Sequence, residues 1–175
     1  MKKQQPSVNI PACAWSRPIG LGWKKPYTVR YASNLDDGPW HGMPLGGFGA
    51  GCIGRSSNGD FNLWHIDGGE HVFQTIPGCQ FSVFEQVGTQ TQAYALNTGS
   101  ADCLHWKRYP ASQEEQSTGT YSALYPRSWF VYENVFQADL TCEQFSPIVA
   151  DNYQETSYPI AIFEWTAHNP TDQPI

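Results

Sequence analysis

An antiparallel hairpin is predicted by residues 49–66, which read Gly49-Ala50-Gly51-Cys52-Ile53-Gly54-Arg55-Ser56-Ser57-Asn58-Gly59-Asp60-Phe61-Asn62-Leu63-Trp64-His65-Ile66. Asn58 and Gly59 both tolerate the positive φ of a type I′ turn, the connection that two-residue hairpins favour. After this turn, Phe61, Leu63 and His65 alternate with Asn62, Trp64 and Ile66, which is the period of a β-strand. Because aromatic residues occur in both sets, we expect a strand that is buried on both faces.

The glycines in the same stretch match the G-x-G-x-x-G pattern of dinucleotide-binding loops over residues 49–54. That site needs a helix directly after the glycines, because the helix N-terminus receives the pyrophosphate. Residues 56–59 are Ser-Ser-Asn-Gly and cannot open a helix of any length. We therefore interpret the glycines as positions of close backbone packing or of a bulged strand.

Further strands are indicated by the same alternation along the chain. A second hairpin is expected over residues 80–96 with its turn at Gly88, and single strands over residues 129–133, 140–145 and 160–167. Residues 110–119 lack an apolar anchor and predict an exposed loop. Since no segment predicts a helix, the fold class is all-β, and the short strands favour an antiparallel β-sandwich.

Two regions are expected in the chain. Residues 1–42 contain five prolines and little periodicity, so they predict an extended arm that lies on the domain without regular elements. Residues 43–175 predict one β-sandwich domain. Because residues 168–175 have the composition of a turn that opens into another strand, we expect the sandwich to be incomplete at the C-terminus and the chain to be a fragment.

The bulk composition excludes several classes of partner. The net charge is -6 and the isoelectric point is about 5.2, whereas nucleic-acid binding depends on clustered Lys and Arg. The sequence also lacks an apolar run near 18 residues, so no spanning helix is expected, and its first residues lack the apolar core of a signal peptide. We expect neither a nucleic-acid partner nor a transmembrane segment.

The cysteines and histidines do not predict a disulfide framework or a metal site. The five cysteines are scattered, never spaced as C-x-x-C, and are expected to be reduced residues of a cytoplasmic protein: Cys13, Cys52, Cys79, Cys103 and Cys142. His65 and His71, with Asp67 and Glu70, form the only local group of possible ligands, and strand alternation would separate them. We interpret these four as turn and surface residues, and we expect no metal and no cofactor.

Aromatic residues in polar stretches are the candidates for sugar binding, because flat rings stack on the apolar faces of pyranoses. Trp40 and Trp106 lie in loop-like sequence and are the predicted substrate-binding residues. No catalytic residue is predicted. The chain has no G-x-S-x-G elbow, and glycoside hydrolysis needs two facing carboxylates that sequence does not identify.

Four ordered blocks together resemble the N-terminal region of glycoside hydrolase family 116, the family of non-lysosomal glucosylceramidases and β-glucosidases. They are Met43-Pro44-Leu45-Gly46-Gly47-Phe48-Gly49-Ala50-Gly51-Cys52-Ile53-Gly54-Arg55, Gly59-Asp60-Phe61-Asn62-Leu63-Trp64, Ala123-Leu124-Tyr125-Pro126-Arg127-Ser128-Trp129-Phe130-Val131-Tyr132 and Leu140-Thr141-Cys142-Glu143-Gln144-Phe145-Ser146-Pro147-Ile148. The resemblance covers roughly residues 40–175 and is more specific than any single block.

This resemblance implies part of a retaining β-glucosidase that acts on β-glucosides, and in animal relatives on glucosylceramide at the cytosolic side of membranes. In that family an N-terminal β-sandwich packs on an (α/α)6 barrel, and the barrel carries the catalytic glutamate and aspartate. The resemblance therefore implies that this chain is non-catalytic and that its partner is the barrel. Two alternatives stay open on the residues alone: a free-standing carbohydrate-binding module, and a small hydrolase that uses two of its own carboxylates.

Overall fold

The computed structural model describes residues 8–21, 41–68, 70–99 and 105–175. Among these residues the regular structure consists of strands and one helical turn. The elements are β1 (Trp15–Pro18), β2 (Pro44–Leu45), β3 (Cys52–Arg55), β4 (Phe61–His65), β5 (Ser82–Val87), β6 (Gln90–Ala95), β7 (Gly119–Leu124), β8 (Arg127–Tyr132), β9 (Asp139–Phe145), α1 (Tyr153–Thr156) and β10 (Ile162–His168).

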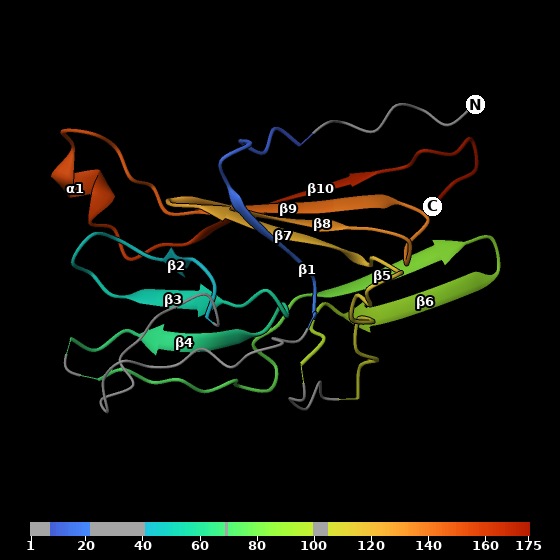
Figure 1. Ribbon diagram of the computed structural model, residues 1–175, viewed down its shortest axis with the longest axis horizontal. Helices are drawn as coiled ribbons and strands as arrows, with labels where there is room; N and C mark the ends of the chain where they lie inside the picture. The colour runs from blue at the N-terminus through green and yellow to red at the C-terminus, as the bar shows by residue number, and fades with distance from the viewer. Residues whose placement is uncertain (1–7, 22–40, 69, 100–104) are drawn as a thin grey trace.

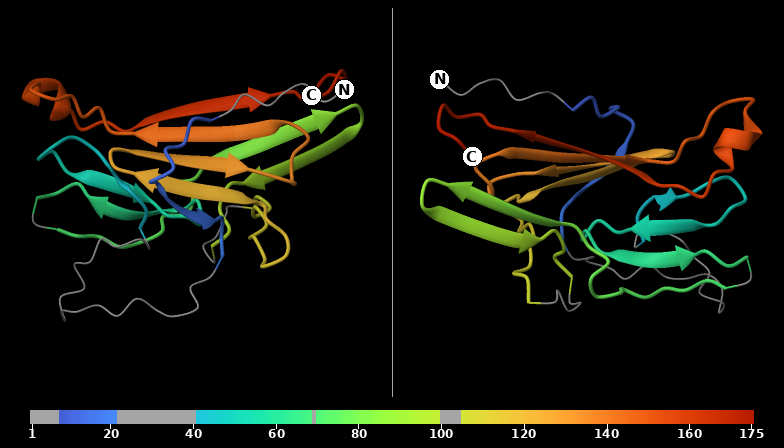
Figure 2. Two further views of the ribbon diagram at one scale, coloured as in Figure 1. Left: turned by 45° about the horizontal axis from the view of Figure 1, so that its top comes forward. Right: turned by 180° about the vertical axis from the view of Figure 1, so that it is seen from behind.

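The strands form two layers. One layer is a five-stranded antiparallel sheet in the order β1-β7-β8-β9-β10. The other contains the three-stranded sheet β2-β3-β4 and, beside it, the hairpin β5-β6. Figure 1 shows the five-stranded sheet lying across both smaller units, and Figure 2 shows the same layering from two other directions. This arrangement confirms the predicted all-β antiparallel sandwich.

The predicted hairpin at Asn58-Gly59 is present as β3 and β4. Its turn differs from the expectation, because Gly59 has a φ of 92° whereas Asn58 does not adopt positive φ. The Gly59 N–H donates to the Ser56 carbonyl at 2.8 Å, and the Ser56 N–H donates to the Asp60 carbonyl at 2.9 Å. These bonds fit a three-residue loop that needs one left-handed glycine, so the predicted type I′ turn is wrong.

Burial of β4 is less complete than expected. Phe61 and Leu63 are buried on one face, whereas Asn62 and Trp64 on the other face are half-buried.

The hairpin over residues 80–96 is confirmed as β5 and β6, with Glu85 on the inner face and Phe84 on the outer face.

Strands β1, β2 and β7 escaped the sequence patterns. Trp15–Pro18 forms the edge strand β1 inside the proline-rich arm, so the expectation that residues 1–42 contain no regular element is wrong for this segment. Pro18 is compatible with an edge strand because one side of the strand makes no ladder bonds. Strand β7 begins at Gly119, at the end of the predicted exposed loop.

That loop is anchored by polar residues rather than apolar ones. Ser112 and Thr118 are buried, and their hydroxyl oxygens lie 3.1 Å apart. The Thr118 N–H donates to Ser112 Oγ at 3.0 Å, and the Ser112 N–H donates to the Ile19 carbonyl at 2.8 Å. Residues 113–116 between them are exposed, as predicted.

The core between the layers is largely aromatic. It is a cluster of buried side chains from both layers and the segments that join them: Ile19, Leu96, Tyr109, Tyr121, Phe130, Tyr132, Leu140 and Cys142. Phe130 and Tyr132 stack at 5.9 Å between ring centroids, and Tyr132 and Trp165 stack at 6.1 Å.

A fully buried guanidinium lies in this core. Arg55, at the end of β3, lies over the rings of Phe130 and Phe81, at 4.0 and 4.9 Å from their centroids. Its Nη2 donates to the Tyr132 hydroxyl at 2.9 Å, and its Nε donates to the Gly59 carbonyl at 3.1 Å. Arg55 therefore joins the β3-β4 turn to the opposite layer, and its charge stabilises the fold through cation–π contacts.

Candidate functional site

The glycine-rich stretch packs backbone against backbone. A Cβ atom on Gly51 would lie 2.3 Å from the His65 carbonyl oxygen, and one on Gly54 would lie 2.5 Å from the His41 carbonyl oxygen. The β3-β4 ladder also shifts register between Gly54 and Arg55. Because Gly54 lies in β3, Gly51 directly precedes it, and β3 is followed by strand β4 rather than by a helix, the interpretation as close packing with a bulge is confirmed.

Four connections meet at the end of the sandwich that carries α1 (Figure 1): residues 46–51, 65–72, 124–127 and 146–161. The first and the last are bonded directly, because the Phe48 N–H donates to the Thr156 carbonyl at 2.8 Å and the Gly46 N–H donates to Ser146 Oγ at 3.0 Å. Cys52 pairs with His65, which brings the second connection beside the first. Arg127 pairs with Phe145, which brings the third beside the last.

Exposed apolar side chains concentrate at this end. Fourteen large apolar residues are exposed in the described part of the chain, and nine of them belong to these four connections: Phe48, Ile66, Val72, Leu124, Tyr125, Val149, Tyr153, Tyr158 and Ile160. Tyr153 is 77% exposed, Ile66 69% and Phe48 66%, so these side chains face solvent rather than the core. We call these nine residues the loop-end surface. Concentrated exposed apolar area of this kind marks an interaction site.

The loop-end surface is grooved and acidic at its border. A cavity of about 150 Å³ opens between the glycine-rich connection and residues 159–161, with Leu45, Ile53 and Ile66 among its lining residues. Asp67, Asp151 and Glu155 are exposed on the same connections. The surface therefore suits an apolar partner with basic residues at its own border.

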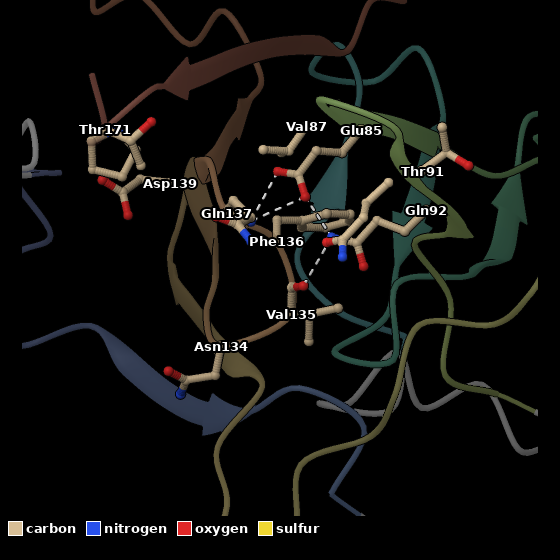
Figure 3. Close-up of a pocket in the computed structure, with 12 residues that line it drawn as sticks. Glu85, Val87, Thr91, Gln92, Asn134, Val135, Phe136, Gln137, Asp139 and Thr171 are labelled. Carbon is tan, nitrogen blue, oxygen red and sulfur yellow. Dashed lines mark hydrogen bonds between the residues drawn. The ribbon is translucent and has the colours of Figure 1, made fainter. Parts of the chain in front are cut away.

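A second candidate lies at the opposite end, where the β5-β6 hairpin meets the β8-β9 connection and the turn after β10. This polar pocket has a volume of about 980 Å³. Figure 3 shows its lining, in which Glu85 and Gln92 of the hairpin face the segment 134–139. Its residues come from three parts of the sequence, so no local pattern predicted it.

The buried carboxylate of Glu85 holds this pocket together. It accepts bonds from the backbone N–H of Gln137 at 2.9 Å and of Ala138 at 2.8 Å, and from Gln92 Nε2. Gln92 Nε2 also donates to the Val135 carbonyl at 3.1 Å. Since the Glu85 oxygens are fully engaged, this carboxylate fixes the hairpin to the connection and is not a free acid or base.

The buried carboxylate of Asp60 is engaged in a similar way. It accepts hydrogen bonds from the hydroxyls of Ser56 and Thr75, the latter at 2.7 Å. Asp60 and Glu85 therefore stabilise a turn and a hairpin, and their bonding gives no support to the small-hydrolase alternative.

The predicted sugar-binding tryptophans do not form a site together. Trp40 lies outside the described residues. Trp106 is 43% exposed and lines neither the groove of the loop-end surface nor the polar pocket. Its assignment to substrate binding stays a prediction.

His65 and His71 pack edge to face, with their ring centroids 4.2 Å apart. In the described ranges, no three His, Cys, Asp or Glu side chains are grouped closely enough to hold a metal ion. Among the same residues, no helix has the length and hydropathy that crossing a membrane requires.

These observations define a class: a two-layer β-sandwich domain with an exposed apolar surface formed by the loops of one end. The family model described as beta-glucosidase 2, glycosyl-hydrolase family 116 N-term, matches residues 42–175. The chain thus belongs to the N-terminal domain family of glycosyl-hydrolase family 116, which confirms the resemblance of the four sequence blocks.

Proposed function

We propose that this chain is the non-catalytic β-sandwich part of a retaining β-glucosidase and that it packs on the catalytic (α/α)6 domain through the loop-end surface. The observation that carries the proposal is the concentration of nine exposed apolar side chains on four connections of one end. Membership in a family defined as an N-terminal part supports the existence of a partner domain.

The energetics favour burial of this surface. Burying a large apolar side chain contributes roughly 1.5–3 kcal/mol. Domain interfaces within one chain typically bury roughly 600–1,500 Å², an area that nine such residues and their neighbours can supply. The bond between the Phe48 N–H and the Thr156 carbonyl connects two of the four loops, so part of the surface is fixed before a partner binds.

A hydrolysis assay tests the non-catalytic assignment. The chain alone is expected to leave 4-nitrophenyl β-glucoside intact, because its buried carboxylates Asp60 and Glu85 are engaged in structural hydrogen bonds. A separately produced family 116 catalytic domain should gain activity or thermal stability when the chain is added. Turnover by the chain alone would contradict the proposal.

The second candidate function is a free-standing carbohydrate-binding module, which the polar pocket favours. The two functions differ in their partner. A module binds sugar without forming a complex with the catalytic domain, whereas a docking domain forms that complex.

We also propose that the parent enzyme acts on β-glucosides of the glucosylceramide type in the cytoplasm. Support comes from the family resemblance and from thiols that form no disulfide in the described residues, among them Cys13, Cys79 and Cys142. Fractionation of cells that express the tagged chain tests the location, and recovery in a secreted fraction would contradict it.

A further inference from the structure

We propose that the polar pocket between the β5-β6 hairpin and residues 134–139 binds a neutral saccharide of at least two sugar units. The site lies at the end of the sandwich opposite the loop-end surface (Figures 1 and 3). The inference therefore goes beyond the docking role and does not depend on it.

The lining offers the hydrogen-bonding groups that sugar hydroxyls need. Gln90 lines the pocket from β6, and Gln137 lines it from the connection between β8 and β9. An amide side chain both donates and accepts, as a hydroxyl does, so each can bond a sugar hydroxyl in either sense.

The same cavity has an apolar part. Val87, Val135 and Phe136 belong to its lining, beside the amides. A pyranose ring presents C–H groups on its faces and hydroxyls around its edge, so an apolar wall with a polar border matches it.

The charges of the pocket disfavour anionic ligands and metal ions. No Lys or Arg is among the lining residues. Both lining carboxylates are engaged, since Glu85 accepts backbone N–H groups and Asp139 Oδ2 lies 3.1 Å from Nδ1 of His168. An anion would meet two carboxylates and no cation, and a metal ion would find no free ligand set.

Size and rigidity point to a short oligosaccharide. The volume of about 980 Å³ lies at the upper end of the range of about 300–1,000 Å³ that small-molecule sites cover. The bonds from Glu85 and Gln92 to the segment 135–138 fix two walls relative to one another. A site whose walls are fixed in advance loses less entropy when it binds.

The test is a titration of the ¹⁵N-labelled chain with cellotriose, maltotriose and mannotriose, followed in ¹H–¹⁵N correlation spectra. At least one trisaccharide, at up to about 20 mM, should shift the amide signals of residues 85–92, 134–139 and 170–171. Glucose 6-phosphate, which is anionic, should leave them in place.

The double variant Gln90→Ala/Gln137→Ala should weaken the binding about tenfold, the change expected for two lost hydrogen bonds to the ligand. The matched control is Gln86→Ala, which changes an exposed glutamine on the other face of the same hairpin and should bind like the parent. The spectra themselves report whether each variant is folded.

Three results with sugars would overturn the proposal: no shift with any of the trisaccharides, equal affinity of the double variant and the parent, or shifts that map to Trp106 instead. A fourth would also refute it: if an added catalytic domain shifts the pocket signals and no sugar reverses the shifts, the cavity belongs to a protein partner. The three sugar-binding results do not bear on docking through the loop-end surface, since that surface lies at the other end.

Discussion

At the residue scale, Arg55 shows how this domain retains a charge inside an aromatic core. The guanidinium lies over Phe130 and Phe81, and two of its N–H groups donate to Tyr132 and Gly59. A planar, weakly hydrated cation can make these contacts at once, whereas a lysine ammonium cannot reproduce the paired geometry. Sequence alone did not predict this role, because the partners come from three different segments of the chain.

The substitution Arg55→Lys should lower the free energy of unfolding by about 1–3 kcal/mol, because a buried hydrogen-bond acceptor is left unsatisfied. Urea denaturation followed by tryptophan fluorescence measures the change. The control is Arg127→Lys at the exposed ion pair with Glu143, where a change within about 0.5 kcal/mol is expected. Equal losses for the two variants would contradict the structural role of Arg55.

A second residue-scale expectation concerns alkaline pH. Burial raises the pKa of the Cys142 thiol to about 11 and that of the Tyr132 hydroxyl to about 12, although Arg55 lowers both. In the unfolded chain the pKa values of a cysteine thiol and a tyrosine hydroxyl are about 8.5 and 10. Between those values and the folded pKa the native state holds more protons than the unfolded state, so stability falls as pH rises.

We therefore expect the urea midpoint to be insensitive to these two groups below about pH 8.5 and to decrease from there toward pH 11. The variant Cys142→Ala removes one of the groups and should show a shallower decrease over this range, whatever its stability at neutral pH. A slope as steep as that of the parent would contradict the assignment.

At the element scale, the connections on either side of the β3-β4 hairpin show two different reasons for a glycine. Gly51 combines a φ of 83° with a carbonyl oxygen 2.3 Å from the position of a Cβ atom, whereas Gly49 has a φ of 75° and open space around it. Gly68 has open space and no positive φ. Substitutions at these three positions therefore distinguish the cost of steric contact from the cost of backbone strain.

Alanine at these positions should produce a graded loss of stability. Gly68→Ala should be close to neutral, Gly49→Ala should cost about 1–2 kcal/mol for the left-handed backbone, and Gly51→Ala should cost more than either. Thermal unfolding of the three variants measures the order. Equal effects at Gly49 and Gly51 would show that the close approach to His65 does not matter.

The elements that sequence predicted are those with a strong alternation of apolar and polar residues. The hairpin of β5 and β6 and the strands β8, β9 and β10 were found in this way. Strand β1 contains Ser16, Arg17 and Pro18, and β7 contains small and polar residues, so the pattern of a buried strand is absent from both. Neither candidate site was predictable, because each is assembled from loops that are distant in sequence.

At the scale of the whole molecule, the two ends of the sandwich have different chemistry. The end with α1 carries nine of the fourteen large apolar side chains that are exposed in the described residues, whereas the other end holds the polar pocket beside Glu85. Figure 1 shows α1 and the β5-β6 hairpin at opposite ends. This difference between the two ends suits a domain in which one end is covered by a partner and the other remains accessible to solvent.

The isolated chain should self-associate through the uncovered apolar end. The double variant Phe48→Ser/Tyr153→Ser should reduce the apparent mass in light scattering, because it removes two of the most exposed apolar residues. The control is Phe84→Ser, since Phe84 is 61% exposed but lies on β5, away from that end. If the control reduces association as much as the double variant, the loop-end surface is not responsible.

The most direct test of the docking role is hydrogen exchange measured by mass spectrometry, with and without a separately produced family 116 catalytic domain. Complex formation should slow exchange in residues 46–51, 65–72, 124–127 and 146–161 and leave the β5-β6 hairpin unchanged. Absence of a complex, or protection confined to the hairpin and residues 134–139, would contradict docking through the loop-end surface.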